Sequence, residues 1–210
     1  QMDRTRLLTI GPRKGCLARA GKARKDDQLA ADRNRRIPAP AMSKLVVFSG
    51  LPGAGKTTLA RAYCEQTGAV HLRVDTIEDA ILRSSLKPAS PEEAGYLAAY
   101  AQAEDNLKLG RDVVADAVNA LEVAREGWRR AAMAANAEFF PVEIICTDAG
   151  AHKTRITERK PDLGALPMPD WTAVQERVWE PWAEDHVIRI ETARRSVDSC
   201  LAELLQRLSE

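Results

Sequence analysis

The amino-acid sequence predicts an α/β fold of three layers, in which a five-stranded parallel sheet has helices on both faces and carries a helical lid. Three observations lead to this prediction. Short apolar runs alternate with helical stretches from Lys44 onward, which is typical of a parallel sheet. A glycine-rich loop follows the first run. Aspartates follow the second and third runs, at the edge where such a sheet forms its binding crevice.

The strands are predicted from the apolar runs, which are short, as expected of buried strands. The first run, LVVF, leads directly into the glycine-rich loop. The predicted strands are residues 45–48, 70–74, 113–115, 139–147 and 186–190.

Helices are predicted between and after these strands. Gly68 ends the first helix, while Pro91 opens the third and Gly110 ends it, an asymmetry typical of helix ends. Residues 160–170 contain three prolines and one glycine and therefore form a loop. The predicted helices are residues 57–67, 76–83, 91–110, 121–135, 149–159, 171–179 and 194–208.

The chain divides by composition into a basic segment and a mildly acidic body. Residues 1–41 hold eleven Lys and Arg against four Asp and Glu, a net charge of +7, and the remainder carries −6. The basic segment has no sustained periodicity, so we expect residues 1–41 to be a disordered extension and residues 42–210 to form one domain. Binding to nucleic acid or anionic lipid, or an organelle address, are alternative roles for the extension. The acidic body argues against a dedicated nucleic-acid binder.

The sequence also predicts the compartment of the protein. No apolar run of about 18 residues is present, so no transmembrane helix is expected. The cysteines at 16, 64, 146 and 200 are far apart and form no Cys-x-x-Cys motif. Reduced thiols in a cytoplasmic protein are therefore expected, rather than a disulfide or zinc framework.

Residues 50–57, GLPGAGKT, match the phosphate-loop pattern G-x-x-x-x-G-K-[ST] between a predicted strand and a predicted helix. Glycines let successive backbone N–H groups point at phosphate oxygens. The following helix adds free N–H groups and the positive end of its dipole. The predicted nucleotide-binding residues are Gly50, Leu51, Pro52, Gly53, Ala54, Gly55, Lys56, Thr57 and Thr58.

Two residues of this loop have distinct expected roles. Lys56 supplies a mobile charge to the β- and γ-phosphates, and the Thr57 hydroxyl ligates Mg²⁺. The Asn-Lys-x-Asp signature of guanine-specific proteins is absent from the sequence. ATP and Mg²⁺ are therefore the predicted ligands.

Asp75 and Asp116 follow the second and third predicted strands. A carboxylate that faces bound ATP can accept a proton from an acceptor hydroxyl or hold the metal. We assign the first role to Asp75 and the second to Asp116. The alternative is that each caps the next helix, because Asp is a favoured N-cap. Asn119 is either a residue that orients Asp116 or a turn residue.

Arg155 and Arg159 are four residues apart in a predicted charged helix and would project from one face of it. We expect them to close over the triphosphate as lid arginines and to neutralise developing charge. The alternative is a solvated helix with surface ion pairs to Glu158 and Asp162. The nearby tryptophans at 171, 179 and 182 are expected in core and hinge packing, and the alternative is stacking on an adenine or an aromatic substrate. His71 is expected to be structural.

Several stretches together resemble the small bacterial P-loop kinases that are grouped with zeta toxins, chloramphenicol phosphotransferases and polynucleotide 5′-kinases. The resemblance covers nearly all of residues 43–210 and none of the extension. It implies a P-loop kinase domain with Asp75 as the acceptor-side base, Lys56 and Thr57 on ATP·Mg²⁺, and a lid with two arginines. The stretches are residues 46–58, 73–77, 114–119, 179–182 and Arg155-x-x-x-Arg159.

One position departs from the pattern of polynucleotide kinases. These enzymes usually have an arginine three residues after the aspartate, whereas here Glu78 stands there. The expected function is therefore an ATP-dependent phosphotransferase that acts on a hydroxyl of a small molecule. The alternatives are a polynucleotide 5′-hydroxyl kinase and a regulatory ATPase that transfers phosphate to no acceptor.

Overall fold

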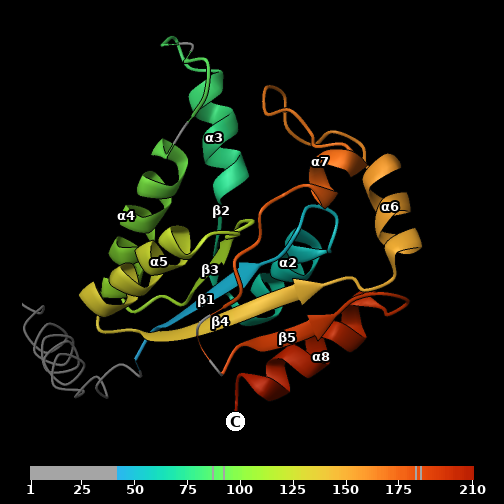
Figure 1. The fold of residues 1–210 in the computed structure, drawn as a ribbon. Coiled ribbons are helices and arrows are strands. Elements are labelled where there is room, and N and C mark those ends of the chain that lie inside the picture. Colours follow the sequence, from blue (N-terminus) through green and yellow to red (C-terminus); the bar gives the residue numbers. More distant parts are fainter. Residues whose placement is uncertain (1–41, 87, 92, 183, 185) are drawn as a thin grey trace, which may run out of the picture. The chain divides into compact units, whose positions relative to one another are not determined.

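The computed structural model describes residues 42–86, 88–91, 93–182, 184 and 186–210, and Figure 1 shows their arrangement. The predicted extension, residues 1–41, lies outside the described residues. Five strands form one sheet in the order β2-β3-β1-β4-β5, and all four pairings are parallel. The strands are β1 Lys44–Ser49, β2 Val70–Arg73, β3 Val113–Asp116, β4 Glu138–Ile145 and β5 Ile188–Glu191.

The helices cover both faces of the sheet (Figure 1). α2 and α8 pack on one face and α4 and α5 on the other. The predicted three-layer fold is therefore confirmed. The helices are α2 Lys56–Thr67, α3 Val74–Leu82, α4 Ala94–Lys108, α5 Glu122–Ala134, α6 Ala149–Thr157, α7 Trp171–Gln175 and α8 Val197–Arg207.

The central strand β1 explains why the first apolar run is continuous. Val46 and Phe48 belong to the core beneath α2 and α8, whereas Leu45 and Val47 belong to the core beneath α4 and α5. All four side chains are fully buried. Because alternate residues of a strand point to opposite faces, a strand between two helical layers needs apolar residues at every position.

Several predicted boundaries were wrong by a few residues. α3 begins at Val74, directly after β2, so no loop separates strand from helix and Asp75 lies in the first helical turn. α4 begins at Ala94 rather than at Pro91. The helix predicted over 171–179 ends at Gln175, because the chain beyond it turns toward α5. No helix in the described ranges is long and apolar enough to cross a membrane.

A buried arginine holds the segment that follows α7. The side chain of Arg125, on α5, is fully buried, and its guanidinium lies 4.3 Å from the ring centroid of Trp182 and 5.2 Å from that of Trp179. These two tryptophans therefore pack against the buried arginine of α5. The guanidinium donates to four carbonyl oxygens, those of Asn119, Ala120, Glu180 and Pro181, at 2.9, 3.2, 2.7 and 3.0 Å.

Replacing this arginine should therefore destabilise the protein. Arg125→Met keeps most of the side-chain volume but leaves several buried carbonyls unpaired, so we expect the free energy of unfolding to fall by about 3 kcal/mol. Urea denaturation followed by circular dichroism measures this change. The matched control is Arg130→Met, also on α5, where the side chain is 74% exposed. Equal losses in the two variants would contradict the proposed role of Arg125.

Candidate functional site

The phosphate loop has a backbone that requires glycine. Gly50 has a φ of 147°, and a Cβ there would lie 2.3 Å from the carbonyl oxygen of Ile144. Gly53 has a φ of 80°, and its Cβ would lie 2.6 Å from Cδ1 of Ile156. α2 then begins at Lys56 without a side-chain cap. Its first N–H groups are therefore available to an anion.

Two residues from distant parts of the chain brace this loop from outside. The Nε2 atom of His152, on α6, lies 2.7 Å from the carbonyl oxygen of Pro52. The hydroxyl of Thr192, just after β5, donates to the carbonyl oxygen of Ala54 at 2.7 Å. These contacts fix two carbonyl groups of the loop from α6 and from the end of β5. They span 100 and 138 residues, so no local sequence signal predicts them.

Lys56 is buried, with 8% of its surface exposed. Its ammonium donates to the carbonyl oxygen of Leu51 at 3.0 Å, within the same loop. Burial lowers the pKa of Lys56 to about 8, although the negative charges of Asp116 and Asp75 oppose this shift. A poorly solvated ammonium between carboxylates is suited to bind the phosphate groups of a nucleotide.

Asp116 ends β3 and is 2% exposed. Burial by itself would raise its pKa, but hydrogen bonds from His71 and Thr57 and the charge of Lys56 hold the pKa below its usual value. The carboxylate therefore stays ionised beside the threonine of the phosphate loop. The Thr57 hydroxyl and this carboxylate supply hard oxygen ligands of the kind that Mg²⁺ binds, so the residues present fit the predicted ion.

Sequence reasoning missed the link between His71 and this carboxylate. The Nε2 atom of His71 lies 3.2 Å from Oδ2 of Asp116. His71 stands opposite Val114 in the β2–β3 register, so its side chain and that of Asp116 are on the same face of the sheet. Asn119 does not orient Asp116, because its amide bonds Phe48 and Trp128.

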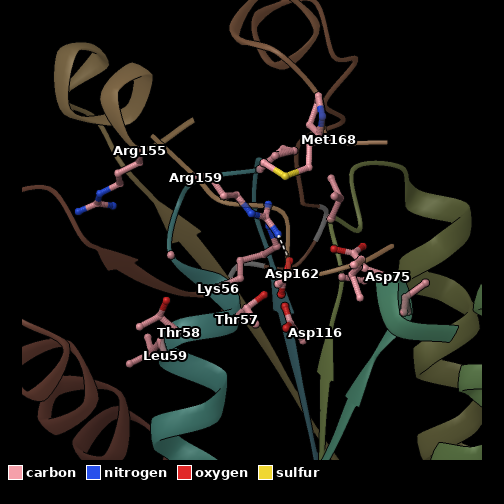
Figure 2. A pocket seen from close by; sticks show the side chains of 18 of the residues that line it. Lys56, Thr57, Thr58, Leu59, Asp75, Asp116, Arg155, Arg159, Asp162 and Met168 are labelled. Carbon is pink, nitrogen blue, oxygen red and sulfur yellow. Dashed lines mark hydrogen bonds and ion pairs between the residues drawn. The ribbon is translucent and has the colours of Figure 1, made fainter. Parts of the chain in front are cut away.

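Asp75 lies in the first turn of α3, half-buried, and lines the same cavity. The alternative that it caps this helix is wrong, because the cap position is Arg73 and no side-chain hydrogen bond caps the helix. Instead Oδ2 of Asp75 lies 3.5 Å from Nη2 of Arg73. Figure 2 shows Asp75 across the cavity from Lys56 and Asp116.

The two predicted lid arginines do not project from one helical face. α6 ends at Thr157, so Arg159 lies in the following loop and the i,i+4 geometry is lost. Arg155 turns away to donate to the hydroxyl and the carbonyl of Thr192, both at 2.8 Å. Arg159 instead points toward Lys56 (Figure 2). Both arginines line the cavity, but at different places.

Asp162, in the loop after α6, joins three arginines from three different elements. It accepts from Nη1 of Arg73 at 2.5 Å and from Nη2 of Arg159 at 3.2 Å, and Nη2 of Arg61 lies 3.8 Å away. Chiefly through the hydrogen bond from Arg73, the pKa of Asp162 falls to about 2. The sequence had indicated this aspartate only as a surface partner of the lid helix, whereas it ties the lid loop to the end of β2.

One cavity of about 900 Å³ connects these groups. The phosphate loop and Arg155 lie at one end of it, and α3 and the lid loop border the other. Glu78, one turn after Asp75, also lines it. Burial, and then the charge of Asp75, raise the pKa of Glu78 from its usual 4.5 to about 7.

The shifted glutamate makes stability depend on pH. Between pH 4.5 and 7 the folded state holds the Glu78 proton more tightly than the unfolded state, so this residue lowers the free energy of unfolding as pH rises through that window. Glu78→Gln removes the effect. We expect its melting temperature to match that of the parent below pH 4.5 and to exceed it by a few degrees above pH 7.

Differential scanning calorimetry across this pH range measures the difference, and Glu176→Gln, at an exposed position outside the cavity, is the control. A Glu78→Gln variant that is less stable than the parent above pH 7 would contradict the assigned shift.

Comparison with known proteins places this site in a family. Residues 45–182 match the family model AAA_33, described as an AAA domain. A UPF0200 protein from Aeropyrum pernix is 31% identical over 100 residues, which cover 40% of this chain and 54% of that protein. The chain therefore aligns with about half the length of this curated relative.

Solved structures share the fold at low sequence identity. A candidate kinase from Chloroflexus aurantiacus superposes with a TM-score of 0.63 at 14% identity, covering 80% of this chain and 99% of that one. The Mycobacterium tuberculosis APS kinase CysC, in complex with AMPPNP and APS, superposes with a TM-score of 0.56 at 20% identity. The match covers 81% of this chain and 100% of that one. Chaetomium thermophilum Kti12, in complex with ADP-AlF3, superposes with a TM-score of 0.57 at 19% identity. The match covers 79% of this chain and 100% of that one.

The sequence match and the structural matches support each other. The family model covers most of the described sheet and the lid, and the solved structures have the same arrangement of layers over nearly their whole length. The predicted resemblance to small P-loop kinases is thereby confirmed at the level of fold. The chain belongs to the AAA domain family AAA_33 and has the fold of the small P-loop kinases.

Proposed function

We propose that this protein is an ATP-dependent phosphotransferase that moves the γ-phosphate of ATP to a hydroxyl of a small molecule. The observation that carries the proposal is the convergence of Lys56, Thr57 and Asp116 with Asp75 in one cavity. The first three are the groups that bind a nucleotide triphosphate with its metal, and Asp75 supplies a carboxylate where an acceptor would lie.

Each group has a role that follows from its position. The inward N–H groups of the phosphate loop and the ammonium of Lys56 bind and orient the phosphates. Thr57 and Asp116 would hold Mg²⁺, which when bound supplies charge neutralisation at the phosphates. Asp75 orients the acceptor hydroxyl and accepts its proton. Arg159 donates to Asp162 through Nη2 only, so its other N–H groups can donate to the transferred phosphate. Arg155, which is bound to Thr192, lies at another place in the cavity lining.

Two of the structural relatives support a nucleotide ligand by analogy, since CysC was solved with AMPPNP and Kti12 with ADP-AlF3.

Glu78 argues against a polynucleotide acceptor, because a second carboxylate one turn after Asp75 lines the cavity. A regulatory ATPase would hydrolyse ATP and leave every acceptor unmodified. Incubation with γ-labelled ATP and a panel of alcohols, sugars, antibiotics and oligonucleotides separates the three functions by which product carries the label.

Replacing the phosphate-loop lysine tests the nucleotide site. Lys56→Ala removes the charge from the β- and γ-phosphates, so we expect weaker ATP·Mg²⁺ binding and a loss of turnover of at least about 100-fold. Isothermal titration calorimetry and the label assay measure the two effects. The control is Lys153→Ala, an exposed lysine on α6 outside the cavity. Equal ATP affinity in the Lys56 variant and the parent would refute the assignment.

Replacing Asp75 separates the reaction from nucleotide binding. Asp75→Asn keeps the shape of the side chain but removes the proton acceptor, so transfer to the acceptor should fall by about 10²–10⁴-fold. ATP affinity and melting temperature should change little. If positioning matters more than proton removal, the acceptor KM rises as well.

Steady-state kinetics with the acceptor found in the panel measure both constants, and Asp105→Asn, on the exposed side of α4, is the control. Full transfer activity in Asp75→Asn would remove this residue from the mechanism.

A further inference from the structure

The lid loop, residues 160–170, runs from α6 to α7 and forms part of the cavity wall. Leu166 and Met168 of this loop are half-buried and line the cavity, and Figure 2 shows Met168 at the top of the view. Three prolines of the loop have no N–H group. The structure describes the whole loop, and residues 160–169 form no backbone–backbone hydrogen bond. The position of the loop must therefore depend on side chains.

A carboxylate of α3 binds the middle of the lid loop. Oδ1 of Asp79 accepts from the backbone N–H of Ala165 at 2.6 Å and from that of Leu166 at 3.1 Å. Its Oδ2 accepts from Nε of Arg83 at 2.7 Å. Chiefly through the N–H of Ala165, the pKa of Asp79 falls to about 2. The carboxylate is therefore ionised at neutral pH, and hydrogen bonds to an ionised acceptor are stronger than those between neutral groups.

A surface ion pair with Arg83, four residues later, does not explain the position of Asp79. The side chain of Arg83 is 61% exposed, whereas that of Asp79 is 4% exposed. Burial of a carboxylate is costly unless hydrogen bonds replace the water that it loses. The lid loop supplies two of the three bonds that Asp79 accepts, so the contact with the loop accounts for most of this compensation.

A second contact between the same two segments runs in the opposite direction. Here the lid loop supplies the carboxylate, since Asp162 accepts from Nη1 of Arg73 at the end of β2. Arg73 immediately precedes α3, and Asp79 follows Asp75 by about one turn of that helix. The two contacts therefore hold the lid loop to the chain on both sides of Asp75.

We infer that Asp79 is a positioning residue for the acceptor, because it holds the lid loop against α3 and so fixes the lid-loop side chains of the cavity relative to Asp75. The inference rests on the proposed function, which places the acceptor beside Asp75. Asp79 is not among the residues that line the cavity, so it acts through the loop and does not touch the substrate. Loss of this contact should therefore impair acceptor binding and leave the phosphate loop intact.

Amide hydrogen exchange tests the contact itself. In residue-resolved NMR measurements on the full chain, Asp79→Ala should make the N–H groups of Ala165 and Leu166 exchange at least about tenfold faster, because each loses its acceptor. Asp79→Asn keeps an oxygen acceptor and should retain part of the protection. Unchanged exchange of both amides in Asp79→Ala would show that Asp79 does not hold the loop.

Asp170→Ala is the matched control. Asp170 also accepts from a backbone N–H, that of Ala173 at 2.8 Å, but this bond is local to the start of α7. Exchange at Ala173 should therefore become faster in this variant, whereas exchange at Ala165 and Leu166 should not.

Steady-state kinetics with the acceptor found by the label assay test the role in the reaction. Asp79→Ala should raise the acceptor KM at least about tenfold, Asp79→Asn should raise it less, and Asp170→Ala should not raise it. The kcat and the ATP affinity should stay within about threefold of the parent, since Asp75 and the phosphate loop are retained. A general loss of structure would impair all of these constants together. An unchanged acceptor KM in Asp79→Ala would overturn the inference.

A substitution in the loop covers the case in which Asp79→Ala does not fold. Ala165→Pro removes the nearer of the two N–H donors without altering α3, so it should raise the acceptor KM in the same way. If both single variants fold, the double variant should have the acceptor KM of Asp79→Ala, because the two substitutions break one contact. Fully additive effects would contradict a shared contact.

The outcomes keep this inference distinct from the proposed function. If phosphate is transferred and the acceptor KM of Asp79→Ala and Ala165→Pro equals that of the parent, the phosphotransferase proposal stands and the inference fails. If the loop amides exchange faster but no acceptor receives the label, the phosphotransferase proposal fails, while the contact between Asp79 and the lid loop is confirmed.

Discussion

The register between β1 and β3 determines the geometry on which the site depends. Phe48 pairs with Asp116, and the phosphate loop begins two residues after Phe48. The two strands are parallel and adjacent, so their carboxyl ends bring the loop and the carboxylate to the same edge of the sheet. Both strands are buried on both faces, and a slip of one residue would turn every core side chain to the wrong layer. The core thereby fixes the position of a polar site.

The phosphate loop itself depends on contacts from the far half of the chain. Its positive φ angles leave carbonyl groups on the outer side, and His152 and Thr192 bind two of them. His152 belongs to α6, the first helix of the lid. The hydroxyl of Thr192 also accepts a hydrogen bond from Arg155. The loop, the lid helix and the end of β5 are therefore linked by side-chain hydrogen bonds.

Charged groups of both signs line the cavity. Toward the phosphate loop, the buried charge of Lys56 lies among carboxylates and has a pKa lowered to about 8. Toward the lid loop, Asp162 engages Arg73 and Arg159, while Asp75, Glu78, Lys160 and Arg177 line the cavity. The buried ammonium of Lys56 thus suits the polyanionic part of a nucleotide.

The sequence by itself determined the α/β fold, the phosphate loop and the two aspartates at strand ends, because hydrophobic periodicity and loop chemistry are local properties that a short segment encodes. Tertiary structure alone decided the rest. It showed that Arg155 and Arg159 separate because α6 ends at Thr157, and that Asp162 is the centre of an ion-pair cluster. Such contacts join residues up to 138 positions apart. The periodicity of one segment does not indicate which distant side chains will contact that segment in the folded chain.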